Sequence, residues 1–298
     1  MTTETARTMP IDEAPPKTNE LRRFLKVFLG RKIVMFFGFI LVAMVFVAIF
    51  ADFIAPYDPY NQDLRNALQQ PSAAHWLGTD NLGRDVLSRV IYGTRVSLLV
   101  GMVSVTIAVV AGVLLGIISG YFGGLIDTVI SRIIDALLAF PGIILALSIG
   151  AVLGAGMWTV IVALAIALTP TFARLMRGQV LTVKEADYIK ASEVIGASNF
   201  RIMLKHVLPN CLSPIIVLVT LNLGVAILAE ASLSFLGIGI TPPQAAWGAM
   251  VSEGQRYLVN NPILSFAPGG CVLLVVLAFN IVGDALRDAL DPRLRGSI

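Results

Sequence analysis

The stretch ADYIKASEVIGASNFRIMLKHVLPN, at residues 186–210, separates two long apolar segments of the chain. It contains two acidic and three basic residues, a histidine, a central glycine and a Leu-Pro pair, whereas the sequence on either side is almost free of charge. A polar, helix-forming insert between apolar runs of membrane-spanning length indicates a loop of a membrane protein.

The composition of the whole chain supports this class. Only 14% of the 298 residues are charged and 56% are hydrophobic, whereas soluble domains carry about 25% charged residues. The apolar residues form long unbroken runs, unlike the short alternating segments of a transmembrane β-barrel. We therefore expect an all-α polytopic membrane protein. Cys211 and Cys271 lie in apolar runs, which predicts small core residues rather than a disulfide or a metal site.

Six segments are long and apolar enough to cross a membrane, which takes about 20 residues. The expected spans are residues 33–51, 97–119, 136–153, 157–172, 212–233 and 263–282. Gly112, Gly116 and Gly120 form a ridge of small residues in the second span, which predicts close approach of another helix. Pro141 is expected to kink or delay the third span.

The distribution of lysine and arginine predicts the orientation of these spans. Seven lie in the first 32 residues, one at position 132, six between residues 174 and 205, and three from residue 287 onward. The opposite face carries five. Because positive charge is enriched in cytoplasmic loops, we expect both termini and the insert to face the cytoplasm. Residues 52–95 and 237–262 then form the outer segments.

The insert itself is expected to be a helical hairpin. Its first helix spans residues 184–195 and ends at Gly196, which suits the left-handed position after a helix. Ser198 can cap a second helix, which Pro209 ends. An amphipathic connector lying on the lipid surface is the alternative interpretation.

The spacing of Ala191, Gly196 and Leu208-Pro209 resembles the cytoplasmic "EAA" loop of binding-protein-dependent ABC importer permeases. The chain departs from that pattern at Lys190, where the consensus has Glu, and at Ser192, where it has a second Ala. The resemblance implies a type I ABC importer permease with six transmembrane helices and a coupling-helix hairpin that docks on a separate ATPase subunit. The coupling residues it implies are Ala191, Ser192, Gly196, Ser198, Arg201, Leu208 and Pro209.

Four further stretches are similar to one subfamily, the second permease subunit of di- and oligopeptide importers, which includes nickel and glutathione importers. They are HWLGTDNLGRDVLSRVIYGTRVSLLVG (75–101), LLAFPGIILAL (137–147), ILAEASLSFLGIG (227–239) and PPQAAWGAM (242–250). The resemblance extends from about residue 34 to residue 293. The outer signature that it contributes consists of Gly78, Thr79, Asp80, Gly83, Arg84 and Asp85.

Taken by its residues alone, the outer signature predicts an interfacial helix that enters the membrane. Thr79 or Asp80 can cap this helix, and Gly93 is expected to end it before the second span. Local ion pairs are expected among Arg84, Asp85 and Arg89. A calcium site at Asp80, Asn81 and Asp85 is disfavoured, because an arginine lies among the oxygen ligands and no bidentate glutamate follows at the proper spacing.

Glu230 is the one acidic residue deep in a predicted span. Its short distance from the outer loop favours a structural carboxylate bonded to a serine or to backbone, while a translocation-pathway residue is the functional alternative. Asn222 is a weaker pathway candidate, for which interhelical hydrogen bonding is the competing role. Trp76, Trp158 and Trp247 are expected at the outer membrane interface.

The sequence contains no P-loop, no G-x-S-x-G, no H-E-x-x-H and no Cys/His cluster. We therefore expect a transport subunit that is not an enzyme, binds no cofactor or metal itself, and depends on ATP and Mg used by partner ATPases. The partners implied by the resemblance are a homologous permease, two ABC ATPase subunits, an extracytoplasmic binding protein and the lipid bilayer, with no nucleic acid. The location implied is the bacterial inner membrane.

Di- or oligopeptides are the expected cargo, with nickel chelates, glutathione or opines as alternatives. A stand-alone secondary transporter or channel is the other class considered, but no internal repeat supports it. An intramembrane protease lacks the required residues. The predicted division of the chain is a basic, disordered tail (1–32), the first span with its outer segment (33–94), the permease core (95–285) with its coupling loop (184–209), and a C-terminal tail (286–298).

Overall fold

The computed structural model describes residues 30–290, and most of the two predicted tails lies outside these residues. Within the described range, every regular element is helical apart from one isolated β-bridge between Thr79 and Asp85. The long helices are α2 (Lys32–Ile49), α4 (Val86–Phe122), α5 (Gly124–Leu138), α6 (Gly142–Leu153), α7 (Met157–Lys184), α10 (Leu208–Phe235) and α12 (Ile263–Leu290). The short ones are α3 (Ala51–Ile54), α8 (Asp187–Val194), α9 (Asn199–Ile202) and α11 (Trp247–Gly254).

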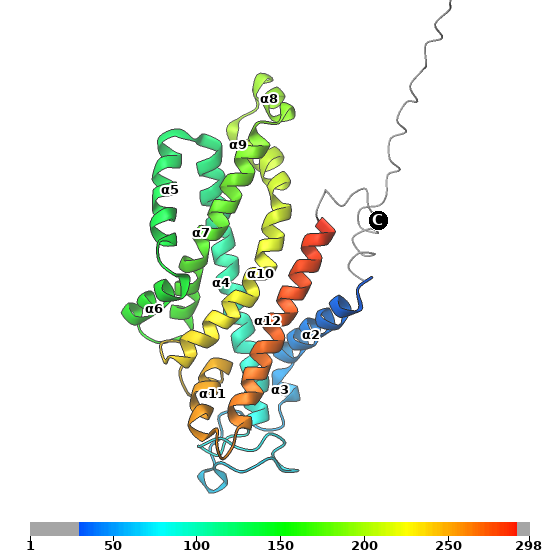
Figure 1. The fold of residues 1–298 in the computed structure, drawn as a ribbon, viewed down its shortest axis with the longest axis vertical. Helices are drawn as coiled ribbons and strands as arrows, with labels where there is room; N and C mark the ends of the chain where they lie inside the picture. The colour runs from blue at the N-terminus through cyan, green and yellow to red at the C-terminus, as the bar shows by residue number, and fades with distance from the viewer. Residues whose placement is uncertain (1–29, 291–298) are drawn as a thin grey trace, which may run out of the picture.

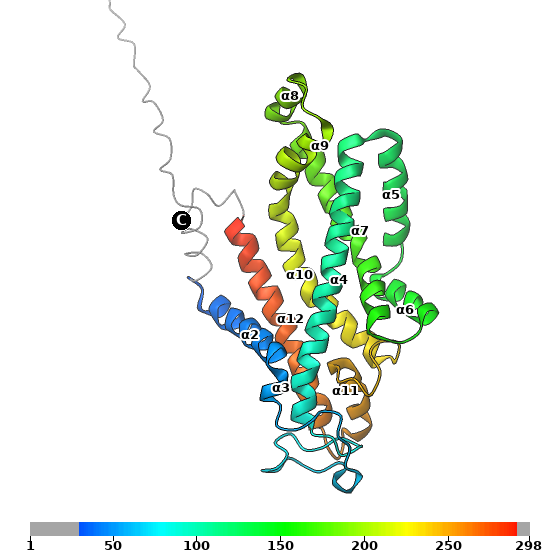
Figure 2. The ribbon, with the colours of Figure 1, turned by 180° about the vertical axis from the view of Figure 1, so that it is seen from behind.

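The long helices form a bundle with distinct ends (Figure 1). Five helices are long and apolar enough to cross a membrane, and the bent pair α5 and α6 brings the number to six if the pair counts as one span. The hairpin of α8 and α9 projects from one end, while residues 55–85 and α11 cover the other (Figure 2). Arg31, just before α2, donates a 2.8 Å hydrogen bond to Asp288 near the end of α12, so the first and last helices meet toward the hairpin end.

The third predicted span, residues 136–153, is broken near Pro141, where the sequence predicts a kink or a delay. The pass consists of α5 and α6, which are bent by 89° around Pro141. Proline has no backbone N–H and disfavours helical geometry in the residue before it, so α5 ends at Leu138 and a new helix begins at Gly142. The predicted bounds omit most of α5 because that part of the sequence carries charged residues.

The second pass is also longer than predicted. Helix α4 runs unbroken for 37 residues, so Gly93 does not end it. Instead, Gly93 makes room for Trp247: a Cβ atom at this position would lie 2.8 Å from the Trp247 Cδ1 atom. Helix α7 likewise continues to Lys184, past the predicted end at residue 172.

The glycine ridge on α4 brings this helix against α7, as the sequence predicted. A Cβ atom at Gly116 would lie 2.5 Å from the Ala173 carbonyl oxygen and 2.7 Å from the Met176 Cβ atom. A Cβ atom at Gly120 would lie 2.9 Å from the Val180 Cβ atom. The two backbones therefore touch without intervening side chains, which is how small residues stabilise helix pairs in lipid.

Polar contacts fasten α5 to this pair at the hairpin end. Arg177 donates two hydrogen bonds to Asp127, at 2.6 and 2.7 Å, and Ser119 of α4 donates a third at 2.5 Å. Arg174 and Asp135 form a further pair at 2.6 Å. Bidentate arginine–carboxylate pairs are geometrically specific as well as strong, so these contacts fix the relative rotation of α4, α5 and α7.

Replacing Gly116 with alanine tests the importance of the helix contact. The added methyl group would force α4 away from α7, and we expect Gly116→Ala to lower the free energy of unfolding by about 1–3 kcal/mol. Denaturant titration of purified protein in detergent measures this loss. Gly178→Ala on α7 is the matched control, because no atom lies within 4 Å of its Cβ position. An equal loss in both variants would contradict the role of the contact.

Candidate functional site

The hairpin at one end of the bundle turns at Gly196. This glycine has a φ of +80°, in the left-handed region, as predicted. Its N–H donates to the Glu193 carbonyl at 3.0 Å, and the Ala197 N–H donates to the Ser192 carbonyl at 3.1 Å, which closes the end of α8. Ser198 occupies the N-cap position of α9 as predicted, but its hydroxyl makes no capping hydrogen bond.

The second limb of the hairpin is continuous with the next transmembrane helix. Helix α9 passes through a π-helical turn (Met203–Val207) directly into α10. The prediction that Pro209 ends the second helix is therefore wrong. In the π turn the Leu208 N–H bonds to the Met203 carbonyl, five residues back. This wider turn shifts the helical register just before Pro209, where a proline that has no N–H would otherwise interrupt the helix.

One face of the hairpin packs against the bundle. Ile189 of α8, Ile202 of α9 and Val207 of the π turn are fully buried. They share an apolar cluster with residues of α4, α7 and α10, namely Ile117, Tyr121, Met176, Val180, Cys211 and Ile215. The hairpin is therefore built onto the transmembrane helices and is not a loose connector.

The other face of the hairpin exposes large apolar side chains. These are Tyr188, Val194, Ile195, Phe200 and Leu204, of which Val194 and Ile195 are more than 80% exposed. An exposed apolar patch of this kind marks an interaction surface. The hairpin points away from the bundle (Figure 1), which does not fit a helix lying flat on the lipid surface.

Most of the residues implied in coupling lie on or beside this exposed face. Ala191, Gly196, Ser198, Arg201 and Pro209 are exposed, while Ser192 and Leu208 are half-buried. Lys190, the departure from the consensus, pairs with Glu185 at 3.0 Å. This hydrogen bond lowers the pKa of Glu185 and raises the pKa of Lys190. The structure leaves the assigned coupling roles as predictions.

At the opposite end of the bundle, Asp85 caps α4. Its carboxylate accepts hydrogen bonds from the Ser88 N–H at 2.8 Å and the Ser88 hydroxyl at 2.7 Å, and it contacts the His75 Nδ1 atom at 2.9 Å. The predicted cap at Thr79 or Asp80 is therefore wrong. Thr79 instead holds the outer loop together through its bonds with Asn66 and Gln69.

Asp80 belongs to a buried charge cluster with Arg84, Arg89 and Glu253. Arg84 donates to Asp80 at 2.6 Å and to Glu253 at 3.3 Å. Arg89 lies 3.4 Å from Asp80 and 3.9 Å from Glu253, and both arginines are 99% buried. Two positive and two negative groups balance each other here, as buried charges must. The cluster joins the outer loop, the start of α4 and α11.

The sequence does not predict the role of Glu253, and it predicts a different environment for Trp247. Glu253 lies 169 residues from Arg84, so no local pattern connects them, although it follows directly after the 242–250 signature. Trp247 was placed at the membrane interface, but it is fully buried and donates its Nε1–H to the Val90 carbonyl at 3.1 Å. Trp76 and Trp158, by contrast, are exposed.

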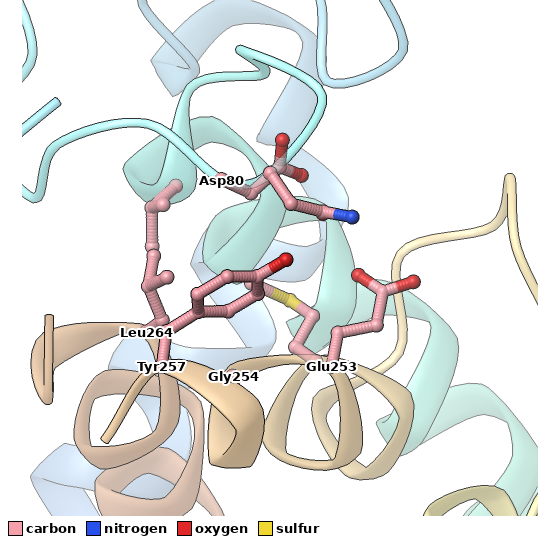
Figure 3. A pocket seen from close by; sticks show the side chains of 8 residues that line it. Asp80, Glu253, Gly254, Tyr257 and Leu264 are labelled. Atoms are coloured by element: carbon pink, nitrogen blue, oxygen red, sulfur yellow. The ribbon is translucent and has the colours of Figure 1, made fainter. Parts of the chain in front are cut away.

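A small cavity borders the charge cluster (Figure 3). Its lining includes Asp80, Glu253, Gly254, Tyr257 and Leu264, and its volume is about 10 Å³. That space is barely enough for one water molecule. The cluster therefore serves to hold the outer elements together and offers no room for a substrate. Among residues 30–290, no group of three or more His, Cys, Asp or Glu side chains is arranged to hold a metal ion.

The two pathway candidates are both buried on α10. Glu230 is fully buried and accepts a 2.8 Å hydrogen bond from Ser234, whose hydroxyl also accepts from the Ile240 N–H at 3.0 Å. This is the serine contact expected of a structural carboxylate. Asn222 donates to the Leu218 carbonyl at 2.9 Å within its own helix. A role for either residue in the pathway stays a prediction.

Comparisons with known proteins identify the relatives of this chain. The profile of a family described as "Binding-protein-dependent transport system inner membrane component" matches residues 112–296, and that of the "N-terminal TM domain of oligopeptide transport permease C" matches residues 20–71. The chain is similar to the glutathione transport system permease protein GsiD of Pectobacterium atrosepticum, at 42% identity over 97% of this chain and 96% of the relative. The same protein of Shigella flexneri is 45% identical over 97% of this chain and 95% of the relative.

Solved structures show the same fold at lower sequence identity. An inward-facing conformation of the MetNI methionine ABC transporter (native crystal form) matches with a TM-score of 0.56 and 20% identity, over 69% of this chain and 97% of that chain. A crystal structure of an amino acid ABC transporter with histidines matches with a TM-score of 0.52 and 16% identity, over 68% and 94% of the two chains. These matches support the arrangement of helices alone.

Neutralising Asp80 tests the outer charge cluster. Asp80→Asn leaves two buried arginines facing one carboxylate, and we expect it to lower the free energy of unfolding by about 3–5 kcal/mol. The control is Asp288→Asn, which breaks an exposed pair whose side chains are 56% and 38% exposed. That pair should contribute about 0–1 kcal/mol. Denaturant titration of both variants in detergent makes the comparison, and equal losses would contradict the structural role of the cluster.

Proposed function

Because the chain belongs to the family of binding-protein-dependent ABC importer permeases, in its peptide, oligopeptide and nickel subfamily, we propose that it forms half of the translocation pathway of an ATP-driven importer of short peptides. The observation that carries this proposal is the hairpin of α8 and α9, which is anchored to the bundle on one face and exposes apolar side chains on the other. The chain is a transport subunit and does not itself act as an enzyme.

The exposed face of the hairpin is the proposed docking surface for an ABC ATPase subunit. An amphipathic helix that presents apolar anchors suits a groove on a partner protein. Gly196 gives the turn a narrow outline, because it carries no side chain and a Cβ atom at this position would meet no other atom within 4 Å. When the ATPases close on ATP and Mg, the hairpin would carry their displacement to α7 and α10, with which it is covalently continuous.

The remaining partners are assigned to the outer end and to the side of the bundle. A binding protein is proposed to dock on residues 52–95 and 237–262, which the buried charge cluster holds in place. A homologous permease would supply the other half of the pathway. Both termini and the hairpin are proposed to face the cytoplasm, in agreement with the excess of lysine and arginine at the hairpin end.

Glutathione and other short peptides are the proposed substrates. The relatives at 42% and 45% identity are named as glutathione permeases. Glutathione is itself a tripeptide, so it belongs to the same chemical class as the di- and oligopeptides of the subfamily. Thermal-shift screening of the cognate binding protein against glutathione, dipeptide pools, nickel chelates and opines tests this choice. Stabilisation by a chelate or an opine alone would contradict the peptide assignment.

Reconstitution of the complex in proteoliposomes tests the mechanism. We expect peptide uptake that requires ATP, the binding protein and the ATPase subunits together. The chain alone should transport nothing. Uphill transport by this chain on an ion gradient, with no ATPase present, would contradict the proposal and would indicate a secondary transporter.

Replacing Gly196 tests the docking of the hairpin. We expect Gly196→Trp to insert normally but to reduce ATP-driven uptake at least tenfold, because the indole would block entry of the turn into its cleft and the left-handed φ resists a side chain. Gly154→Trp is the control, since this glycine has a φ of +86°, a Cβ atom there would also meet nothing within 4 Å, and the residue lies outside both proposed docking surfaces. ATPase capture at wild-type yield together with normal uptake would contradict the docking role.

A further inference from the structure

Helix α4 is not next to the hairpin in the chain, yet its last turn shares an apolar cluster with both limbs. Tyr121, one residue before the end of α4, is only 5% exposed. It lies in the same apolar cluster as Ile189 of α8 and Ile202 of α9. One side chain of α4 therefore belongs to the apolar cluster that anchors both limbs of the hairpin.

Polar groups of Tyr121 bond to the last residue of α7, before the hairpin, and to the start of the second limb. Its carbonyl accepts a 2.7 Å hydrogen bond from Lys184, the last residue of α7, and the Lys184 ammonium lies 5.5 Å from the centre of the tyrosine ring. Its hydroxyl donates to the Asn199 Oδ1 atom at 3.2 Å, on the first residue of α9. Tyr121 therefore links the residue that enters the hairpin to the start of the second limb, through a helix that belongs to neither.

The second limb needs such a link because of the turn that joins it to α10. The π turn at Met203–Val207 replaces the ordinary helical hydrogen bonds by wider ones, and Pro209 follows it with no N–H to donate. Kinks in helices arise at such places. If the hairpin bent at this turn when the ATPase subunits displaced it, the transmembrane helices would move less than the hairpin does.

We propose that Tyr121 is a positioning residue that braces the second limb of the hairpin against α4 and α7, so that the hairpin moves with these helices as one rigid body. The coupling part of this inference rests on the proposed function. The brace also extends the reach of the hairpin: α4 runs 37 residues to the outer end, where Asp85 and Arg89 belong to the outer contacts. A displaced hairpin would then move the outer loop as well as α7 and α10.

Removal of the tyrosine hydroxyl tests the brace directly. Tyr121→Phe keeps the ring and the carbonyl bond but loses the bond to Asn199. In the full chain in lipid nanodiscs, we expect amide hydrogen exchange to quicken by about fivefold over residues 199–207, the factor that corresponds to one ordinary hydrogen bond. Exchange in the outer half of α10 should stay unchanged. Unchanged exchange over residues 199–207 would overturn the proposal, whatever the chain transports.

The transport readout uses the whole reconstituted complex. We expect Tyr121→Phe to raise the ATP hydrolysed per substrate molecule imported by about fivefold, at unchanged capture of the ATPase subunits, since one hydrogen bond restrains the joint. Thr128→Val on α5 is the control, because it also removes one hydroxyl, which is exposed and bonds to the Gly124 carbonyl of its own helix at 2.9 Å. A coupling ratio equal to that of the wild type would overturn the transmission role, whereas a wild-type complex that imports nothing on ATP would overturn the proposed function instead.

A double-mutant cycle separates bracing from direct contact with the ATPase. Asn199 is exposed and could touch a partner itself. If it acts through Tyr121, Asn199→Ala should add nothing to the effect of Tyr121→Phe on the coupling ratio. Fully additive effects would show that the two residues act independently and would overturn the brace.

Discussion

The close approach of α4 and α7 is the contact on which the other features depend. In lipid, apolar side chains gain little by leaving one apolar environment for another, so helices associate through close packing and polar contacts. Glycines at positions 112, 116 and 120 let the two backbones touch. Arg84 and the capping residue Asp85 lie directly before α4, and Arg89 lies in its first turn. Helix α7 leads into the hairpin. The pair therefore holds the two ends of the molecule in one frame.

The charged groups of the described chain are arranged differently at these ends. At the outer end Arg84 and Arg89 are buried and share the carboxylates of Asp80 and Glu253. Separating these groups would leave a buried charge without a partner, which costs much free energy. At the hairpin end Glu185 and Lys190 form an exposed ion pair, and contacts with water can replace this pairing at little cost in free energy. The charge cluster is thus built to keep its shape, whereas the exposed pair at the hairpin end can be separated at little cost.

The sequence predicted the features that depend on local chemistry. Long apolar runs located the passes, four-residue spacing located the glycine contact, and Gly196 was correctly given a left-handed conformation. It did not predict features set by distant neighbours. Gly93 looked like a helix end because the Trp247 ring that fills its space lies far along the chain. The partner of Arg84 at Glu253 was hidden for the same reason.

The prolines show why helix ends are harder to predict than helix interiors. Pro141 and Pro209 are chemically identical, yet the first separates two helices at an 89° bend and the second lies inside a continuous helix. The difference lies in what precedes them. Before Pro209, a π turn shifts the hydrogen-bond register, so the missing N–H does not end the helix. Before Pro141 no such turn exists in the described chain, and α5 stops. The break at Pro141 separates two helices that can move independently. The helix after the hairpin is continuous through its π turn, so it can transmit a displacement if the turn is kept from bending.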